Sequence, residues 1–225
     1  DENMLYIVAD GMGGHAGGEV ASRICVDSIF EYLKKVSLVG KNRLDSLRDP
    51  DLTTVKVETL LHEAINWASS QIYEKALEDP MLRGMGTTAT LAIFRNNLCH
   101  LAHVGDSRLY FFREGFLYQV SSDHSLVSEQ IKAGLLNEDD AEVFQLRNVI
   151  TRSVGYQEQE EVDTGTVEIF DKDKIMLCSD GLHGKVNDIA IAAAMPKKTE
   201  TLAAQLVKEA NENGGDDNIS VVTIE

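Results

Sequence analysis

Cysteine, proline and basic residues are scarce in this chain of 225 residues, and it has no long hydrophobic run. The three cysteines, Cys25, Cys99 and Cys178, are odd in number and far apart, which argues against a disulfide framework and fits a reducing, cytoplasmic compartment. No apolar run approaches the roughly 18 residues that a transmembrane helix needs, and no signal peptide is visible, so we expect no membrane segment in this chain.

Basic side chains are outnumbered by acidic ones, with 21 lysines and arginines against 37 aspartates and glutamates, a net charge of −16. This balance argues against a nucleic-acid partner, because phosphate backbones bind to clustered lysine and arginine. Hydrophobic residues make up 43% of the chain and charged residues 26%, as in ordinary globular proteins. The length suits one large domain, and no internal repeat interrupts it, so we expect residues 1–225 to form a single domain.

Helical and strand-like patterns alternate along the chain. The first segment, 5–9, reads as a buried strand, and apolar stripes predict two long helices, one through Ala21, Cys25, Ile29, Leu33 and Val36 and one from Val57 to Ala76. Four strand-like runs follow, with turns at Asn96-Asn97 and Glu114-Gly115, which predicts an antiparallel meander over 87–94, 98–104, 108–112 and 116–120.

The last third of the chain has the same mixed character. We expect a helix over 125–142, strands over 162–169, 174–178 and 219–224, and short helices over 188–194 and 200–212. Strands that cluster in hairpins between helices favour an α+β fold over a parallel βαβ fold. The acidic stretch of about 126–147 is a candidate flap over the site, where it would influence substrate choice, although a solvated helix without that role fits the pattern equally.

Aspartates recur where strands end, each beside a Gly, Ser or Asn. The four places are Asp10-Gly11, Asp106-Ser107, Asp180-Gly181 and Asp216-Asp217-Asn218. Any one of them alone could be an ordinary turn. Four carboxylates that meet in one cleft would repel each other unless cations held them, and Mg²⁺ or Mn²⁺ prefers such oxygen ligands. Together they predict a divalent-metal site.

The glycine loop after the first strand admits a rival hypothesis. Residues 11–16 match the GxGxxA pattern of a dinucleotide site, between a strand and a helix. Against this, Asp10 would lie beside a pyrophosphate, and another long helix follows where a second strand should be. His100 and His103 fall on opposite faces of a strand and cannot share a metal. We expect His124 to form hydrogen bonds within a loop rather than to act as a catalyst, and His183 to lie in a loop after Asp180 with no spacing to a partner residue.

The motifs, in this order, resemble those of the metal-dependent Ser/Thr protein phosphatases of type 2C, the PPM family, in their bacterial form. The matching segments span nearly the whole chain. They are 8–15, 84–88, 103–108, 122–125, 147–152, 177–182 and 217–220. Their number and order make the resemblance specific, since a single Asp-Gly pair would be weak evidence.

The resemblance implies a four-layer α-β-β-α sandwich of two antiparallel sheets flanked by helices, with metal ions bound between the ends of the sheets. It implies that Asp10 bridges two Mn²⁺ or Mg²⁺ ions and that the Gly11 carbonyl binds one of them. By the same pattern Asp180 and Asp217 complete the direct ligands. Asp106 matches the acid that, with Asp180, holds a more weakly bound third ion.

The chemistry of these residues agrees with the family pattern. Two ions held by carboxylates lower the pKa of a bridging water and clamp the attacking and leaving oxygens of a phosphoryl group. We therefore expect hydrolysis of phosphoserine and phosphothreonine on proteins that a Ser/Thr kinase phosphorylates. The expected nucleophile is a metal-bridged hydroxide, with no phosphoenzyme and no catalytic side chain besides the ligands. The acid excess favours substrates with basic surroundings.

Two departures from the family stand out. Members carry a phosphate-binding Arg ahead of the first strand, and Asp1–Asn3 lies too close to Asp10 to supply it, so we expect the N-terminal strand segment to be missing. This leaves a catalytically impaired regulatory or binding module as the alternative function. In addition, residues 182–185 read Leu-His-Gly-Lys, where the family more usually has an acidic turn.

Overall fold

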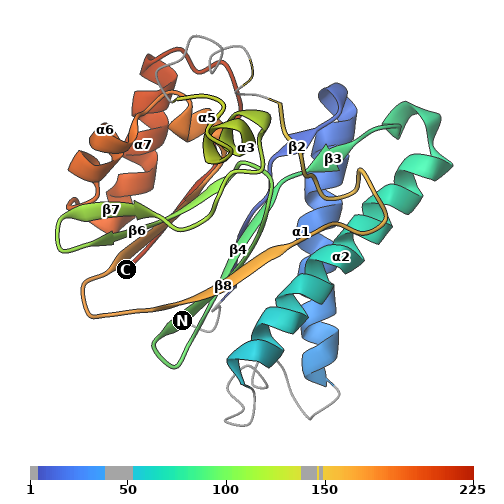
Figure 1. The fold of residues 1–225 in the computed structure, drawn as a ribbon, viewed down its shortest axis with the longest axis horizontal. Helices are drawn as coiled ribbons and strands as arrows, with labels where there is room; N and C mark the ends of the chain where they lie inside the picture. Colours follow the sequence, from blue (N-terminus) through green and yellow to red (C-terminus); the bar gives the residue numbers. More distant parts are fainter. Residues whose placement is uncertain (1–4, 39–52, 138–145, 147–148) are drawn as a thin grey trace.

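Two antiparallel β-sheets face each other, and helices cover the outer face of each (Figure 1). The computed structural model describes residues 5–38, 53–137, 146 and 149–225. Helices α1 (Gly14–Leu38) and α2 (Thr54–Glu78) cover one sheet, and α6 (Asp188–Ala194) and α7 (Thr199–Glu212) cover the other. The predicted four-layer α+β sandwich is confirmed. No helix in the described part of the chain is long and apolar enough to cross a membrane.

The strand order within each sheet corrects one prediction. The first sheet runs β1 (Leu5–Val8), β4 (Ala89–Arg95), β5 (Leu98–Val104) and β8 (Asp163–Glu168). The second runs β10 (Val221–Ile224), β9 (Lys174–Cys178), β6 (Arg108–Arg113) and β7 (Phe116–Gln119). The predicted four-strand meander is therefore wrong, because β5 and β6 belong to different sheets, and residues 105–107 carry the chain across.

The two predicted hairpin turns are present on either side of that crossing. Asn96 and Asn97 have φ of 49° and 58°, and Glu114 and Gly115 have φ of 52° and 87°. Two consecutive residues with positive φ match the right-handed twist of the strands that they join. These turns pair β4 with β5 and β6 with β7.

Three hydrophobic cores separate the four layers. Strand β4 alternates between them, because Leu91 and Ile93 pack against α1 and α2 while Ala92 faces the opposite sheet. This burial on both faces explains why β4, and likewise its neighbour β5, read as largely apolar runs. Each cysteine lies in a different core, and all three are free and buried.

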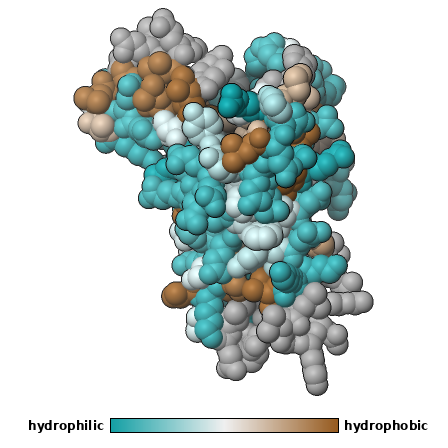
Figure 2. Space-filling view, turned by 90° about the vertical axis from the view of Figure 1, so that its right-hand side faces the viewer, coloured by the Kyte–Doolittle hydropathy of each residue, from teal (hydrophilic) through white to brown (hydrophobic). Residues whose placement is uncertain are grey.

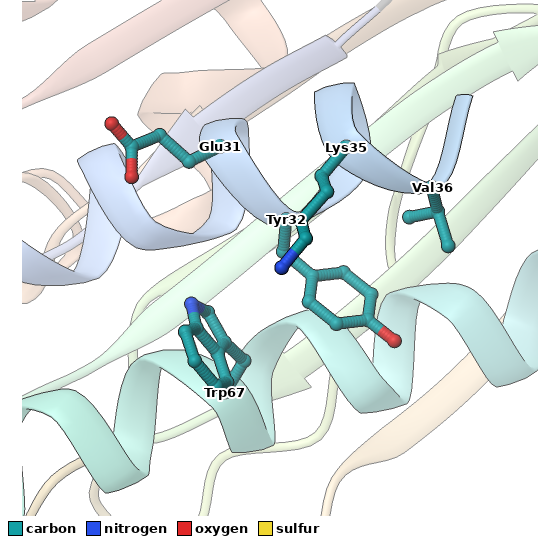
Figure 3. Close-up of a pocket in the computed structure, with 5 residues that line it drawn as sticks. All are labelled: Glu31, Tyr32, Lys35, Val36 and Trp67. Atoms are coloured by element: carbon teal, nitrogen blue, oxygen red, sulfur yellow. The ribbon is translucent and has the colours of Figure 1, made fainter. Parts of the chain in front are cut away.

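The stripes predicted for the long helices are largely confirmed. Ala21, Cys25, Ile29 and Leu33 of α1 are buried, and so are six of the α2 positions, Val57, Leu61, Ala64, Ile65, Ala68 and Ile72. Val36 was predicted to share the α1 stripe but is 36% exposed. It lines a hollow of about 320 Å³ with Tyr32 of α1 and Trp67 of α2 (Figure 3). The outer side of this helix layer is mainly hydrophilic across its middle (Figure 2).

The strand topology contradicts the hypothesis that the glycine loop binds a dinucleotide. A βαβ unit would place a parallel strand next to β1, but β1 pairs with β4 in antiparallel register, and α1 leads to another helix. Gly11 and Gly18 have a different use. A Cβ built on Gly11 would lie 1.9 Å from the Gly18 carbonyl oxygen, so these glycines let β2 (Gly11–Met12) and α1 pack together.

The candidate flap begins as a short helix. The helix predicted over 125–142 starts as expected, with Ser125 capping α3 (Leu126–Lys132), but it stops at Ala133, before Gly134 at a φ of 71°. Positive φ favours glycine and ends a helix. The described residues also include the 3-10 turn Pro80–Leu82 and the short helix α5 (Asp180–His183). Residues 138–145 and 147–148 of the candidate flap, and Asp1–Asn3, lie outside the described residues.

Candidate active site

The predicted carboxylates meet at one end of the sandwich, where loops from both sheets converge. Asp10 follows β1, Asp106 follows β5, Asp180 is the first residue of α5 after β9, and Asp217 lies just before β10. An open cleft of about 480 Å³ is lined by Asp106, Asp180 and Asp217. It lies beside α5 and α3, which sit next to each other at the top of Figure 1. Asp10 lies against Asp180, within reach of a side-chain hydrogen bond.

The negative charges of these four carboxylates repel one another strongly. Burial, together with the neighbouring charges of Asp180, Asp217 and Asp106, raises the pKa of Asp10 to about 8. Burial, followed by the charge of Asp180, raises the pKa of Asp106 to about 7. Oxygen Oδ1 of Asp180 is buried, with no hydrogen-bond partner among the residues that the structure describes. A cation in their midst would relieve both the repulsion and the missing contact.

The donor set fits a hard divalent ion that keeps much of its water. Within the described ranges, no group of three or more His, Cys, Asp or Glu side chains is placed so that together they could hold a metal ion. Mg²⁺ characteristically binds through one or two carboxylates and several waters rather than through a cage of protein ligands alone. The open cleft beside Asp180 and Asp217 leaves room for those waters.

A pair of threonines ties two of the carboxylate loops together. The backbone N–H of Asp10 donates to Thr88 Oγ1 at 2.9 Å, and the Asp10 carbonyl accepts from the Thr88 backbone N–H at 2.8 Å and from Thr87 Oγ1 at 2.9 Å. The Thr88 hydroxyl also lies 2.8 Å from Ser107 Oγ, next to Asp106. Thr88 and Ser107 are buried. The segment 84–88 thus links the Asp10 and Asp106 loops, a role that the sequence did not reveal.

His124 holds the Asp106 loop from the other side. Its backbone N–H donates to the Gly105 carbonyl at 2.7 Å, and its Nδ1 accepts the Gly105 N–H at 3.1 Å. Its Nε2 lies 3.1 Å from Asp163, so the ring carries its proton on Nε2. Burial lowers the pKa of His124, which keeps Nδ1 free to accept. The prediction that His124 is a loop hydrogen-bonder is confirmed.

Sequence reasoning missed His183. It was predicted to lie in a loop after Asp180 with no spacing to a partner residue, but it ends α5, and its Nε2 donates to the Asp106 backbone carbonyl at 3.0 Å. Burial lowers the pKa of His183, so the ring is neutral. The two residues are 77 positions apart in sequence, so no local pattern signals their contact.

Comparison with known proteins decides the family. A family model described as protein phosphatase 2C matches residues 1–216. The chain belongs to the protein phosphatase 2C family. It is 34% identical to the serine/threonine phosphatase stp of Listeria welshimeri, over all of this chain and 85% of that protein. It is also 34% identical to the protein phosphatase PhpP of Streptococcus pneumoniae, over 98% of this chain and 85% of that protein.

Solved structures of the family agree with the fold. The serine/threonine phosphatase PstP/Ppp of Mycobacterium tuberculosis superposes with a TM-score of 0.84 at 32% identity, covering 98% of this chain and 87% of the other. A catalytic domain of PstP, solved in complex with two manganese ions, gives a TM-score of 0.79 at 31% identity, covering 98% and 86%. The resemblance stated from the sequence motifs is confirmed at the level of family and fold.

The repulsion in the cleft predicts how the stability of this phosphatase-family chain depends on pH without metal. The folded chain keeps a proton on Asp10 up to a pKa of about 8, while the ordinary pKa is 3.8. Between these values the folded state binds more protons than the unfolded state, so the contribution of Asp10 to stability falls as pH rises. The Asp10→Asn variant has no such group. We expect its stability advantage over the wild type to grow from pH 5 to pH 8.

Urea unfolding of both proteins in chelator at several pH values measures this difference. Subtracting one from the other removes the titration of the histidines and of other groups common to both. A difference in unfolding free energy that stays constant or shrinks as pH rises would contradict the raised pKa of Asp10.

Proposed function

We propose that this chain is a divalent-metal-dependent phosphatase that hydrolyses phosphoserine and phosphothreonine on proteins. The proposal is supported by one cluster of carboxylates: Asp106, Asp180 and Asp217 line an open cleft, and Asp10 lies against Asp180. Burial and mutual repulsion raise the pKa of Asp10 and Asp106. Membership of the family of Ser/Thr phosphatases supports the substrate class.

The proposed roles follow the predicted ligand set. Asp10, with the Gly11 carbonyl, Asp180 and Asp217, would hold two Mn²⁺ or Mg²⁺ ions, and Asp106 with Asp180 would hold a third. A relative solved with two manganese ions supports the first two ions and the type of metal. When bound, such ions make a shared water acidic enough to attack phosphorus in line with the leaving serine or threonine oxygen.

The surrounding residues fix the positions of those ligands. Thr88 joins the backbones next to Asp10 and Asp106, and His124 and His183 hold the Asp106 loop through Gly105 and the Asp106 carbonyl. Because these loops already hold the ligands in position, little rearrangement is needed when the ions bind. This lowers the free-energy cost of binding the ions. None of these residues needs to transfer a proton in this scheme.

The proposed partners are phosphorylated proteins that a Ser/Thr kinase modifies, in the cytoplasm. The acidic chain offers little to nucleic acid. A regulatory or binding module without activity is the alternative. The retained cluster of repelling carboxylates favours the enzyme, because a module that binds no metal would gain stability by losing them.

Acid quenching tests the direct attack on phosphorus. A peptide carrying ³²P-phosphoserine is mixed with excess enzyme and Mn²⁺ and is quenched at times within one turnover. We expect labelled inorganic phosphate and no label on the protein, because no side chain forms a covalent intermediate. Stoichiometric label on the protein would contradict direct attack, and absence of labelled phosphate would contradict the proposed activity.

A further inference from the structure

The segment Leu182–Lys185, which departs from the usual family turn, places basic side chains on the cleft. His183, Gly184 and Lys185 line it together with Asp180 and Asp106. Within the described part of the chain, Arg108 is the other basic residue of the lining. A phosphate group entering this acidic cleft needs positive charge beyond the ions that neutralise the acids, so the partners of each base matter.

Two of the three basic side chains already bind other groups of the protein. Arg108 donates from Nε and Nη2 to Asp123 at 3.0 and 2.8 Å, and both side chains are largely buried. This two-pronged pair would leave a buried carboxylate uncompensated if it opened. His183 is neutral, and its Nε2–H donates a hydrogen bond to the Asp106 carbonyl. Neither is available to an incoming phosphate.

Lys185 differs because its partner is exposed to solvent. Its ammonium pairs with Asp216, whose side chain is 73% exposed, while the Lys185 side chain is only 23% exposed. An ion pair with such an exposed partner is weak and exchanges readily. The Lys185 backbone is fixed, since its N–H donates to the Leu182 carbonyl and its carbonyl accepts from Asn213 Nδ2, both at 3.0 Å. The backbone of Lys185 is therefore fixed, while its ammonium group can exchange one partner for another.

We propose that Lys185 Nζ binds the phosphate oxygens of the substrate, and of the inorganic phosphate product, by exchanging Asp216 for the phosphate dianion. This role rests on the proposed function and adds a substrate-binding residue to it. A dianion offers the ammonium more charge and more acceptor oxygens than the exposed carboxylate that it replaces. The lysine acts on binding, because it contacts oxygens that do not leave during the reaction.

A purely structural role for the pair makes a different prediction. The Lys185–Asp216 pair could serve only to hold the loop 214–217, which carries Asp217. In that case Lys185→Met and Asp216→Asn would have the same effect, because each breaks the pair. In the proposed role the two variants act in opposite directions, since Asp216→Asn frees the ammonium for phosphate.

The experiment measures the Kd of inorganic phosphate by calorimetry with Mn²⁺ present, and the KM and kcat for p-nitrophenyl phosphate. We expect Lys185→Met to raise both the phosphate Kd and KM about tenfold with kcat little changed, and Lys185→Arg to restore both. Asp216→Asn should leave them equal or lower. Lys208→Met breaks a comparable exposed pair with Glu212 on α7 and should change neither.

Equal increases in Kd for Lys185→Met and Asp216→Asn, or no increase for Lys185→Met, would overturn the proposal. The Mn²⁺ affinity of each variant, measured separately, shows whether the Asp217 loop has moved, and a matching loss in both variants also overturns it. A wild type that binds phosphate through Lys185 but hydrolyses nothing would refute the proposed function and leave this inference standing.

Discussion

We expect Asp10→Asn to lower kcat for phosphopeptide hydrolysis by at least about 10³-fold and to leave the fold intact. Asp10 lies against Asp180 at the centre of the carboxylate cluster, and its pKa is raised to about 8 by burial and by its acidic neighbours. An amide there removes one negative charge and one ligand oxygen from the place where the ions are proposed to bind. Several kcal/mol of transition-state stabilisation depend on those ions.

Thermal unfolding supplies the control for this variant. Mn²⁺ should raise the unfolding temperature of the wild type by mass action, and this stabilisation should be much smaller in Asp10→Asn. Without metal the variant should unfold at the same temperature or higher, since it lacks the repulsion. Asp171→Asn, an exposed acid outside the cleft, should keep full activity. Near-normal turnover of Asp10→Asn would refute its assignment as a ligand.

Gly105→Ala is expected to have the largest effect on stability of the variants considered. Gly105 has a φ of 109°, and a Cβ built there would lie 2.6 Å from Thr88 Cγ2. The positive φ costs an alanine roughly 1–2 kcal/mol and the clash costs roughly 1–3 kcal/mol more. We expect the free energy of unfolding to fall by about 3 kcal/mol and Mn²⁺ affinity to fall with it, because Gly105 precedes Asp106.

Gly115→Ala separates backbone strain from the clash. Gly115 has a φ of 87°, but nothing lies within 4 Å of a Cβ built there. The hairpin variant should lose only about 1–2 kcal/mol of stability and keep its Mn²⁺ affinity. Urea unfolding and calorimetric Mn²⁺ titration measure both. Equal losses of stability in the two variants would show that the close packing of Gly105 against Thr88 contributes nothing to the effect of Gly105→Ala.

The placement of the candidate ligands was predictable because each is encoded locally. An aspartate directly after an apolar run and beside a glycine or serine ends a strand, and this pattern located Asp10, Asp106 and Asp180 correctly at strand ends. The sheet to which each strand belongs was not predictable in this way. Strands β5 and β6 are separated by three residues, as in a hairpin, and only the positive φ of Gly105 and its contacts with His124 send the chain into the second sheet.

Contacts between loops that are distant in sequence could not be predicted from the sequence. The hydroxyl of Thr88 and the ring of His183 act on the Asp106 loop across 19 and 77 residues of sequence. A single chain gives no signal for such pairs, because neither residue type nor spacing distinguishes a threonine at a loop junction from one in any strand. The alternation along β5 was by contrast readable, and His100 and His103 do lie on opposite faces, facing Thr166 and Thr90.

The dependence of hydrolysis on added metal shows whether the cleft carboxylates form a metal-dependent catalytic site. The purified chain is stripped with chelator, dialysed into metal-free buffer and assayed on a phosphothreonine peptide, first without metal and then with increasing Mn²⁺ or Mg²⁺. We expect no release of phosphate without metal and restoration of activity by saturating Mn²⁺, because the repelling carboxylates of the cleft need ions to become a catalytic site. Unchanged hydrolysis in the metal-free protein would contradict the account.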